Sequence, residues 1–294
     1  MAIPLVMVGG FLGAGKTTLL WQAARRLTAK GLRVGLITND QAPDLVDTGL
    51  LLRHGLDVRE VTGSCFCCDF PTLVEAASSL ENRLHTDILI AEPVGSCTDL
   101  SATILQPLKD RHTQDFRLAR LSVLADPTRI EAALDARATD LHPSAAYIVR
   151  KQLEEADVIV LNKADLLGAA EAAALRARVE VAFPGAEIRF ISALSGQGVD
   201  EWLASTQSAE PAGGRILEID YDIYAEGEAV RVGVCRPRGR RRRGWDRNPS
   251  ELQDPAQPPA GSTKADVPLR GGRPAKVKLG AAAPVNPSRA CYQR

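Results

Sequence analysis

The stretch GFLGAGKT at residues 10–17 fits the pattern G-x-x-x-x-G-K-[ST] and closely follows an apolar run from Ile3 to Val8. In a phosphate-binding loop of this kind, glycines let backbone N–H groups face the phosphates, and the following helix adds the positive end of its dipole. Lys16 would neutralise phosphate charge and the Thr17 hydroxyl would bind Mg²⁺. An ordinary glycine turn between a strand and a helix is the alternative, but such a turn would not require every residue of the pattern, and here the whole pattern is present. The sequence predicts a nucleoside triphosphate site built from Gly10, Gly13, Ala14, Gly15, Lys16, Thr17 and Thr18.

A second motif, NKAD at residues 162–165, follows the apolar run at 157–161. An aspartate in this position accepts hydrogen bonds from the ring N–H and the exocyclic amine of guanine, a pair that adenine does not offer. The motif is short, so its place after a strand and far downstream of the phosphate loop is what makes it informative. ISAL at residues 191–194 resembles a loop whose backbone supports the guanine carbonyl, although a plain loop is an alternative. GTP is therefore the predicted nucleotide, read by Asn162, Lys163, Asp165, Ser192 and Ala193.

An acidic residue ends another apolar run, at 87–91. Glu92 stands where a Walker B carboxylate holds the Mg²⁺ shell, and Gly95 is placed to turn its N–H toward the γ-phosphate. The polar segment TNDQAPDLVD at residues 38–47 is a candidate first switch, ordered by the γ-phosphate and released on hydrolysis. Its acids are either metal ligands or solvated loop residues and helix caps; they are Asp40, Asp44 and Asp47.

Three cysteines lie close together in GSCFCC, residues 63–68. Thiolates are soft ligands that suit Zn²⁺ and Cu(I), and so dense a cluster favours a metal site. Buried apolar filler and a redox pair are the rival interpretations. Tetrahedral zinc would need a fourth ligand from His54, a switch acid, a client protein or water. The predicted metal ligands are Cys65, Cys67 and Cys68, whereas His54, His85, His112 and His142 are scattered and individually more typical of surface or capping positions.

Together these motifs resemble the CobW-type metallochaperone GTPases, which include zinc-regulated GTPase metalloprotein activators and nitrile hydratase activators. The resemblance rests on GGFLGAGKTTLL at residues 9–20, on GSCFCC where the family has a C-x-C-C loop, on E-x-x-G from Glu92, and on NKAD. It covers roughly residues 3–203. EPVGSCTDL at residues 92–100 looks nearer to the cobalamin-synthesis-like or nitrile-hydratase-activator-like branch than to CobW itself.

The resemblance implies roles for particular residues. Cys65, Cys67 and Cys68 become the metal loop, Asp47 matches a switch-one acid, and Glu92 matches the Walker B acid. Lys16, Thr17, Glu92 and Asp47 would then serve hydrolysis, with Thr17 and Glu92 also holding Mg²⁺. One departure stands out: where the family commonly has N-E-F-G-E, this chain has NDQAP at residues 39–43, so the family's second switch glutamate is missing.

Composition favours a cytoplasmic α/β protein. The chain has 294 residues, no stretch of 18 apolar residues that would span a bilayer, and a start that runs into the phosphate loop in place of a signal peptide. Six cysteines in a nucleotide-binding chain indicate cytosolic thiols and not a disulfide framework. A client metalloprotein and a homodimer are the partners we expect; a membrane and nucleic acid are not.

The formal net charge of zero conceals an asymmetry. Residues 231–294 hold 15 Lys and Arg against 4 Asp and Glu, a net charge of +11, so the first 230 residues carry −11. This segment also holds 9 of the 18 prolines and lacks apolar periodicity, which is typical of disorder. Binding of nucleic acid or of an anionic membrane by its arginine run is a second interpretation. A frameshifted terminus is a third interpretation. The resemblance implies a second α/β domain, and Arg215–Tyr221 begins like a strand of that domain before the apolar patterning stops near Ala229.

The remaining pattern alternates strands and helices, which predicts a P-loop NTPase fold: a mostly parallel sheet with helices on both faces. Strands are expected near 3–8, 33–38, 57–61, 87–91, 120–125, 157–161 and 187–190. Helices are expected near 16–30, 71–83, 99–108, 128–137, 144–156, 170–182 and 198–205, the first ending at Gly31. The predicted domains are a GTPase domain (1–212), the start of a truncated second domain (213–230) and a basic tail (231–294).

The sequence thus predicts a GTPase whose nucleotide cycle is coupled to transition-metal handling, with GTP, Mg²⁺ and Zn²⁺ as ligands. No Gln or Arg stands out as a water-positioning or finger residue, so we expect slow intrinsic turnover. Two alternatives stay open. One is a regulatory GTP-binding switch with structural cysteines, and the other is a nonfunctional truncated family member.

Overall fold

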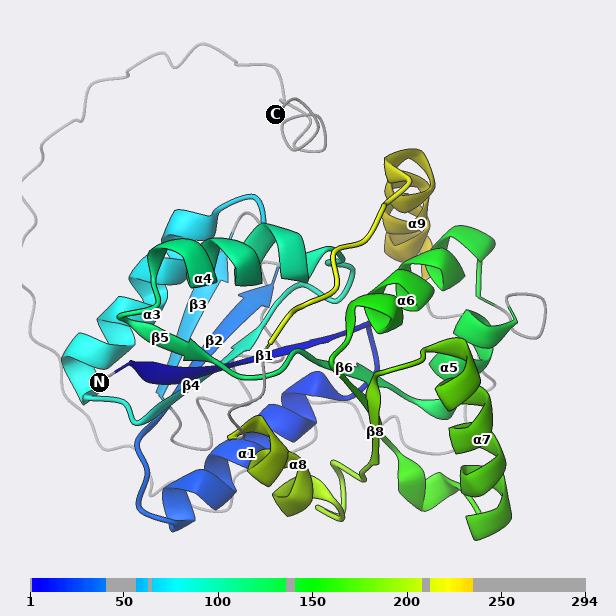
Figure 1. Ribbon diagram of the computed structural model, residues 1–294, viewed down its shortest axis with the longest axis horizontal. Coiled ribbons are helices and arrows are strands. Elements are labelled where there is room, and N and C mark those ends of the chain that lie inside the picture. The colour runs from blue at the N-terminus through cyan, green and yellow to red at the C-terminus, as the bar shows by residue number, and fades with distance from the viewer. Residues whose placement is uncertain (1, 41–56, 63–64, 136–140, 208–211, 235–294) are drawn as a thin grey trace, which may run out of the picture. The chain divides into compact units, whose positions relative to one another are not determined.

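The computed structural model describes residues 2–40, 57–62, 65–135, 141–207 and 212–234 (Figure 1). Met1–Cys235 form one compact unit. Asp44, Asp47, His54 and the basic tail beyond Val234 lie outside the described residues, so the predictions made for them stay predictions. Residues 231–234, which the sequence analysis assigns to the tail, belong to a helix instead.

An eight-stranded sheet forms the centre of this unit. Its strand order is β3-β2-β4-β1-β6-β7-β8, with β5 also paired to β1, and every pair is parallel. Parallel strands are buried on both faces, which explains why they are continuous apolar runs in the sequence. The strands are β1 (Ile3–Gly10), β2 (Val34–Asp40), β3 (Asp57–Thr62), β4 (Ile88–Glu92), β5 (Phe116–Leu118), β6 (Ser122–Ala125), β7 (Val158–Leu161) and β8 (Glu187–Phe190).

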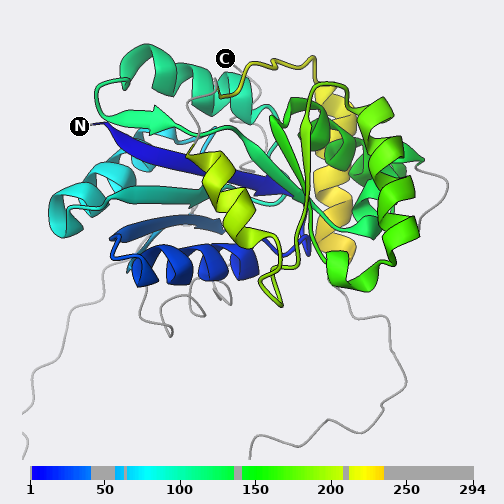
Figure 2. The same cartoon turned by 60° about the horizontal axis from the view of Figure 1, so that its bottom comes forward.

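Helices cover both faces of the sheet (Figure 1). One face carries α1 and α8, which lie side by side in Figure 2 and are joined by a 3.2 Å ion pair between Arg26 and Asp200. The other face carries α3, α4, α5, α6 and α7. The helices are α1 (Lys16–Ala29), α3 (Phe70–Leu84), η1 (Ser101–Leu105), α4 (Gln106–Arg111), α5 (Pro127–Leu134), α6 (Pro143–Glu155), η3 (Ala164–Leu166), α7 (Ala169–Ala182), α8 (Val199–Thr206) and α9 (Tyr221–Val234).

Each face of the sheet has its own apolar core. Under α1 and α8 the largest buried side chain is Trp202, whose indole N–H donates to Ser122 Oγ at 3.0 Å. A buried indole needs such a partner, and here it also ties α8 to β6. All seven predicted strands and all seven predicted helices are present, and Gly31 ends α1 with a left-handed φ of 83° as expected.

The strand expected at Arg215–Tyr221 is wrong. Residues 212–220 form neither strand nor helix, and the chain then enters α9. Local capping overrides the alternating apolar pattern, because Asp220 Oδ1 accepts hydrogen bonds from the backbone N–H groups of Asp222 and Ile223 at 3.0 and 3.2 Å. Helix α9 packs on α6, with Ser144 Oγ donating to Glu226 at 2.7 Å (Figure 1). The division at residues 212 and 230 stays a prediction.

Candidate functional site

The phosphate loop joins β1 to α1, at the carboxyl edge of the sheet. Gly10 has a φ of 133°, and a Cβ there would lie 2.4 Å from the Leu124 carbonyl oxygen. Gly15 stands at the N-cap of α1 with a φ of 94°, and a Cβ there would lie 2.3 Å from Asn162 Nδ2. Only glycine satisfies both the left-handed backbone and the close packing at these two positions. The loop is therefore held tightly against the strands on its β6 side.

Lys16, Thr17 and Glu92 meet beside this loop. Lys16 Nζ lies 3.6 Å from Glu92 Oε1 and 3.5 Å from the Phe11 carbonyl oxygen. Thr17 Oγ1 donates to Glu92 Oε2 at 3.5 Å. Lys16 and Glu92 are buried, at 6% and 7% exposure. An ammonium group, a hydroxyl and a carboxylate converge, which is the donor set that a phosphate chain and its Mg²⁺ require.

Gly95 approaches the same loop from the other side. A Cβ at Gly95 would lie 3.2 Å from the Leu12 backbone nitrogen and 3.3 Å from Lys16 Nζ. The backbone after β4 therefore lies directly against the phosphate loop. This packing is consistent with the predicted contact between the Gly95 N–H and the γ-phosphate.

The NKAD motif follows β7. The buried Asn162 does not point outward: its Nδ2 donates to the Ala14 carbonyl at 2.8 Å, and its Oδ1 accepts from the Ala193 N–H at 2.9 Å. One amide thus joins the phosphate loop to the loop after β8. Asp165 lies in η3 and is exposed, so its carboxylate is accessible to a ligand, and Ser192 is buried beside Ala193.

Asp126 is a site residue that the sequence analysis missed. It follows β6 and accepts a hydrogen bond from Lys163 Nζ at 2.7 Å. Lys163 has a left-handed φ of 61° and also donates to the Gly13 carbonyl at 3.0 Å. Arg129 donates to the Leu12 carbonyl at 3.0 Å. The signal for Asp126 was present, because it is an acid directly after a predicted strand at the same edge of the sheet.

The cysteine loop, residues 65–68, precedes α3. Cys65 Sγ lies 2.8 Å from Cys67 Sγ and 2.9 Å from Cys68 Sγ, and Cys67 Sγ lies 4.0 Å from Cys68 Sγ. Within the described ranges, these three sulfurs form a group of potential metal-ligand atoms that all lie within 4.8 Å of one another. Cys68 is disulfide-bonded in the structure, whereas Cys65 and Cys67 are free. A site of three thiolates at this loop therefore requires Cys68 to be reduced.

The free thiols of this loop differ in acidity. Hydrogen bonds from Cys67 and from Cys97 lower the pKa of Cys65 to about 3, while the hydrogen bond to Cys65 raises the pKa of Cys67 to about 12. A thiolate at Cys65 surrounded by protonated thiols is the state that these contacts favour. Metal binding here must displace the remaining protons.

The histidines do not join the cysteine loop among the described residues. His112 Nδ1 lies 3.0 Å from Asp115 Oδ2, and His142 Nδ1 accepts from the Ser144 N–H at 3.4 Å at the start of α6. His85 is the C-cap of α3. Asp40 ends β2, and its side chain lies outside the described part of the structure, so its predicted role stays a prediction.

Helix α6 fixes the segment that follows β4, residues 93–100, which we call the post-β4 segment. Gln152 Nε2 donates to the Gly95 carbonyl at 3.1 Å and to the Cys97 carbonyl at 2.9 Å. Glu155 Oε2 accepts from the Ser101 N–H at 3.2 Å. Burial raises the pKa of Glu155 to about 8, against the lowering effect of the Ser101 N–H. The sequence analysis missed both residues, because nothing in the sequence separates them from ordinary polar positions on a helix.

The match to a family model decides what kind of domain this is. Residues 4–190 match the nucleotide-binding domain of CobW/HypB/UreG. The chain belongs to this family. The phosphate loop, the acid at the end of β4 and the NKAD motif all lie within or at the carboxyl edge of the matched sheet, so the domain is a P-loop nucleotide-binding domain.

Curated relatives extend the similarity. The chain is 30% identical over 200 residues to the zinc chaperone CobW of a Sinorhizobium species, which covers 60% of this chain and 55% of that one. It is 28% identical over 173 residues to the zinc chaperone YjiA of Escherichia coli, covering 58% and 52%. It is 26% identical over 202 residues to zinc-regulated GTPase metalloprotein activator 1 of Dictyostelium discoideum, covering 56% and 40%. The chain thus spans about half the length of these relatives.

Solved structures show a distant likeness. HypB from Helicobacter pylori in complex with nickel has a TM-score of 0.48 and 16% identity, covering 71% of this chain and 92% of that one. A Zn(II)-bound triple mutant of YjiA has a TM-score of 0.45 and 18% identity, covering 76% and 69%. Among the described residues, none of the helices combines the length and apolar content that crossing a membrane requires.

Proposed function

We propose that this chain is a GTP-binding and GTP-hydrolysing metallochaperone, which couples its nucleotide cycle to the binding and delivery of a transition metal, zinc first among the candidates. The observation that carries the proposal is the convergence of three cysteine sulfurs in one loop of a nucleotide-binding domain whose curated relatives include zinc chaperones. Three neighbouring sulfurs suit zinc chemically. We expect the protein to act in the cytoplasm, where thiols stay reduced, and to deliver metal to a client metalloprotein.

The nucleotide half of the proposal follows from the loop geometry. Lys16 and the phosphate-loop amides would hold the phosphates, and Gly95 would donate its N–H to the γ-phosphate. Thr17 and Glu92 would hold Mg²⁺, which when bound neutralises charge on the transferring phosphoryl group. The contact of Glu92 with Lys16 keeps this carboxylate within reach of the phosphate loop.

Guanine selectivity would depend on Asp165. Replacing it with Asn exchanges an acceptor for an amide, which suits the carbonyl of xanthine better than the amine of guanine. We therefore expect Asp165→Asn to bind xanthosine triphosphate more tightly than GTP, measured by titration with both nucleotides. Unchanged preference for GTP would remove Asp165 from the base site. Lys16→Ala should abolish binding of either nucleotide, whereas Lys30→Ala, at the exposed C-cap of the same helix, should leave it unchanged.

The metal half is tested on the reduced full-length chain. Zn²⁺ affinity is measured by competition with a chromogenic chelator in the presence of GTP or GDP, with a phosphine reductant to open the disulfide at Cys68. We expect Zn²⁺ affinity to differ between the two nucleotides, and by linkage GTP affinity must change by the same factor when Zn²⁺ is added. The triple variant with Ser at 65, 67 and 68 should lose zinc binding and retain GTP binding. Equal zinc affinity in both nucleotide states would instead support a GTP-binding switch with structural cysteines.

A further inference from the structure

A glutamine and an arginine of α1 reach the loop between β8 and α8, residues 191–198, which we call the β8–α8 loop. Gln22 Nε2 donates to the Leu194 carbonyl at 3.4 Å, and Arg26 Nη2 donates to the Gly196 carbonyl at 3.0 Å. Arg26 Nη1 also donates to Gln22 Oε1, so the two side chains are joined to each other. They are four residues apart, which places both on one face of the helix. Helix α1 therefore holds two carbonyls of this loop.

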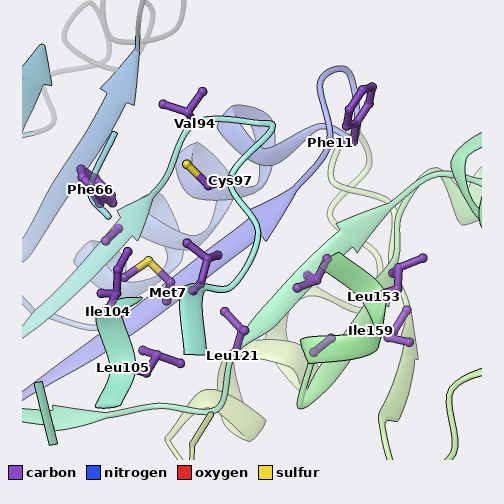
Figure 3. Packing of buried hydrophobic residues seen from close by; sticks show 14 of the residues in the cluster. Met7, Phe11, Phe66, Val94, Cys97, Ile104, Leu105, Leu121, Leu153 and Ile159 are labelled. Atoms are coloured by element: carbon purple, nitrogen blue, oxygen red, sulfur yellow. The ribbon is translucent and has the colours of Figure 1, made fainter. Parts of the chain in front are cut away.

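Core packing does not explain a glutamine at this position. Gln22 is 3% exposed and belongs to the buried set with which α1 covers the sheet, a set made up mostly of leucines and alanines. Figure 3 shows the core on the opposite face of the sheet, where the labelled side chains are apolar. A buried amide costs free energy unless it is hydrogen-bonded. The Gln22 nitrogen meets this condition through the loop carbonyl, so the contact with the loop is what makes a glutamine suitable here.

The loop that these residues hold has a backbone N–H available to a ligand. Four of the five N–H groups from 192 to 196 donate within the chain at 2.7–3.2 Å, those of Ser192, Ala193, Ser195 and Gly196. The fifth, that of Leu194, has no acceptor among the described residues, and Leu194 is 81% exposed. Under the proposed function the guanine carbonyl needs a backbone donor from this loop. The Leu194 N–H can supply it without breaking a hydrogen bond of the fold.

We infer that Gln22 and Arg26 are positioning residues of the base site, which hold the β8–α8 loop so that the Leu194 N–H meets the guanine carbonyl. They act through carbonyls of the loop, and Asp200 of α8 fixes the guanidinium in turn, at 3.2 Å from Arg26 Nε. Helix α1 also carries Lys16 in its first turn. One rigid helix thereby sets the distance between the phosphates and the base. This inference rests on the proposed binding of GTP.

Two analogues of GTP separate this role from a merely structural one. In 6-thio-GTP a sulfur, which accepts hydrogen bonds weakly, replaces the carbonyl oxygen of guanine. In ITP the exocyclic amine that Asp165 would bind is absent. Affinities for GTP and both analogues are measured by titration of the full-length chain and of its Gln22→Met variant, which keeps a side chain of similar size and loses the amide. A substitution that only loosened the protein would weaken the binding of all three nucleotides by the same factor.

We expect Gln22→Met to lower the affinity for GTP by about two- to tenfold, the range for one hydrogen bond, and the affinity for 6-thio-GTP by less. The preference for GTP over 6-thio-GTP therefore falls, while the preference for GTP over ITP stays within about twofold of the wild type. Arg26→Met should change both preferences in the same way. Lys30→Met is the control, because Lys30 pairs with Asp200 at 3.8 Å as Arg26 does but has no hydrogen bond to the β8–α8 loop among the described residues.

Amide hydrogen exchange of the wild type, followed residue by residue by NMR, gives an answer that needs no variant to fold. GTP should slow the exchange of the Leu194 N–H, and 6-thio-GTP should slow it less. Exchange at Leu194 that GTP leaves unchanged overturns the inference, as does an equal preference for GTP over 6-thio-GTP in the wild type and in folded Gln22→Met. Both results leave the binding of GTP standing. Binding of ATP as tight as that of GTP in the wild type overturns the guanine site itself, and the inference with it.

Discussion

Glu155 is a buried acid whose replacement should stabilise the protein at high pH. It is the last residue of α6, fully buried, and its Oε2 accepts the Ser101 N–H at 3.2 Å while Oε1 has no hydrogen-bond partner among the described residues. Burial raises the pKa of this carboxyl from 4.5 to about 8, and Asp99 adds to the increase. The neutral acid is therefore the form that the fold accommodates.

The sign of the effect follows from proton linkage. Below pH 4.5 the carboxyl is protonated in both the folded and the unfolded chain, so its contribution to stability is fully present. Between pH 4.5 and about 8 only the unfolded chain ionises, and the free energy of unfolding falls by up to about 1.4 kcal/mol per pH unit. Over this window the loss has an upper bound of about 5 kcal/mol, and above pH 8 it is complete.

Glu155→Gln should remove this pH dependence. The glutamine stays neutral and keeps an oxygen to accept the Ser101 N–H, so its unfolding free energy should exceed that of the wild type by several kcal/mol at pH 9 and approach it near pH 5. Urea titrations at intervals from pH 5 to 9 measure the difference. Glu154→Gln is the control, because its pairs with Arg150 and Lys151 are partly exposed and contribute about 1 kcal/mol at most. Parallel curves for Glu155→Gln and the wild type across the whole range would refute the reasoning.

Two further substitutions test the nucleotide site. Asn162→Ala leaves a carbonyl of the phosphate loop and an N–H of the β8–α8 loop unpaired, so the free energy of unfolding should fall by about 2–4 kcal/mol, as measured by urea unfolding. The control is Asn82→Ala at an exposed position, whose free energy of unfolding should stay within about 0.5 kcal/mol of the wild type. Gly95→Ala places a methyl group 3.3 Å from Lys16 Nζ, so GTP affinity should fall while GDP affinity, which involves no γ-phosphate, changes little. Titration with fluorescent GTP and GDP analogues distinguishes the two, and an equal loss for both nucleotides would contradict the placement of Gly95.

Much of the fold was predictable because the strands are buried on both faces. Ile88–Glu92 is an apolar run that ends in an acid, and Val158–Leu161 is an apolar run followed directly by Asn162. Such runs mark both the strand and the edge where a ligand binds. The phosphate loop and NKAD were predictable for the same reason, since each is a short motif at a strand end. β5 (Phe116–Leu118) was missed because three residues carry too little pattern.

The remaining parts depend on contacts between distant segments. Gln152 acts through backbone carbonyls 55 and 57 residues away, so its own sequence context is that of an ordinary helix. Cys97 lies in the stretch EPVGSCTDL, but its burial in the same apolar cluster as Phe66 of the cysteine loop appears only in the structure. The strand expected at 215–221 failed for a local reason, the capping of α9 by Asp220.

The place of β1 in the sheet divides the site into two halves. β3, β2 and β4 lie on one side of β1, with the cysteine loop and the post-β4 segment after them, and β6, β7 and β8 lie on the other side, with NKAD and the 191–194 loop after them. Under the proposed function, the metal and the guanine base would be bound on opposite flanks of β1, and the triphosphate would lie between them. A lineage could exchange one metal for another through mutations on the first flank while its preference for guanine stayed untouched on the second. The same boundary marks where two relatives could be recombined into a working chimera.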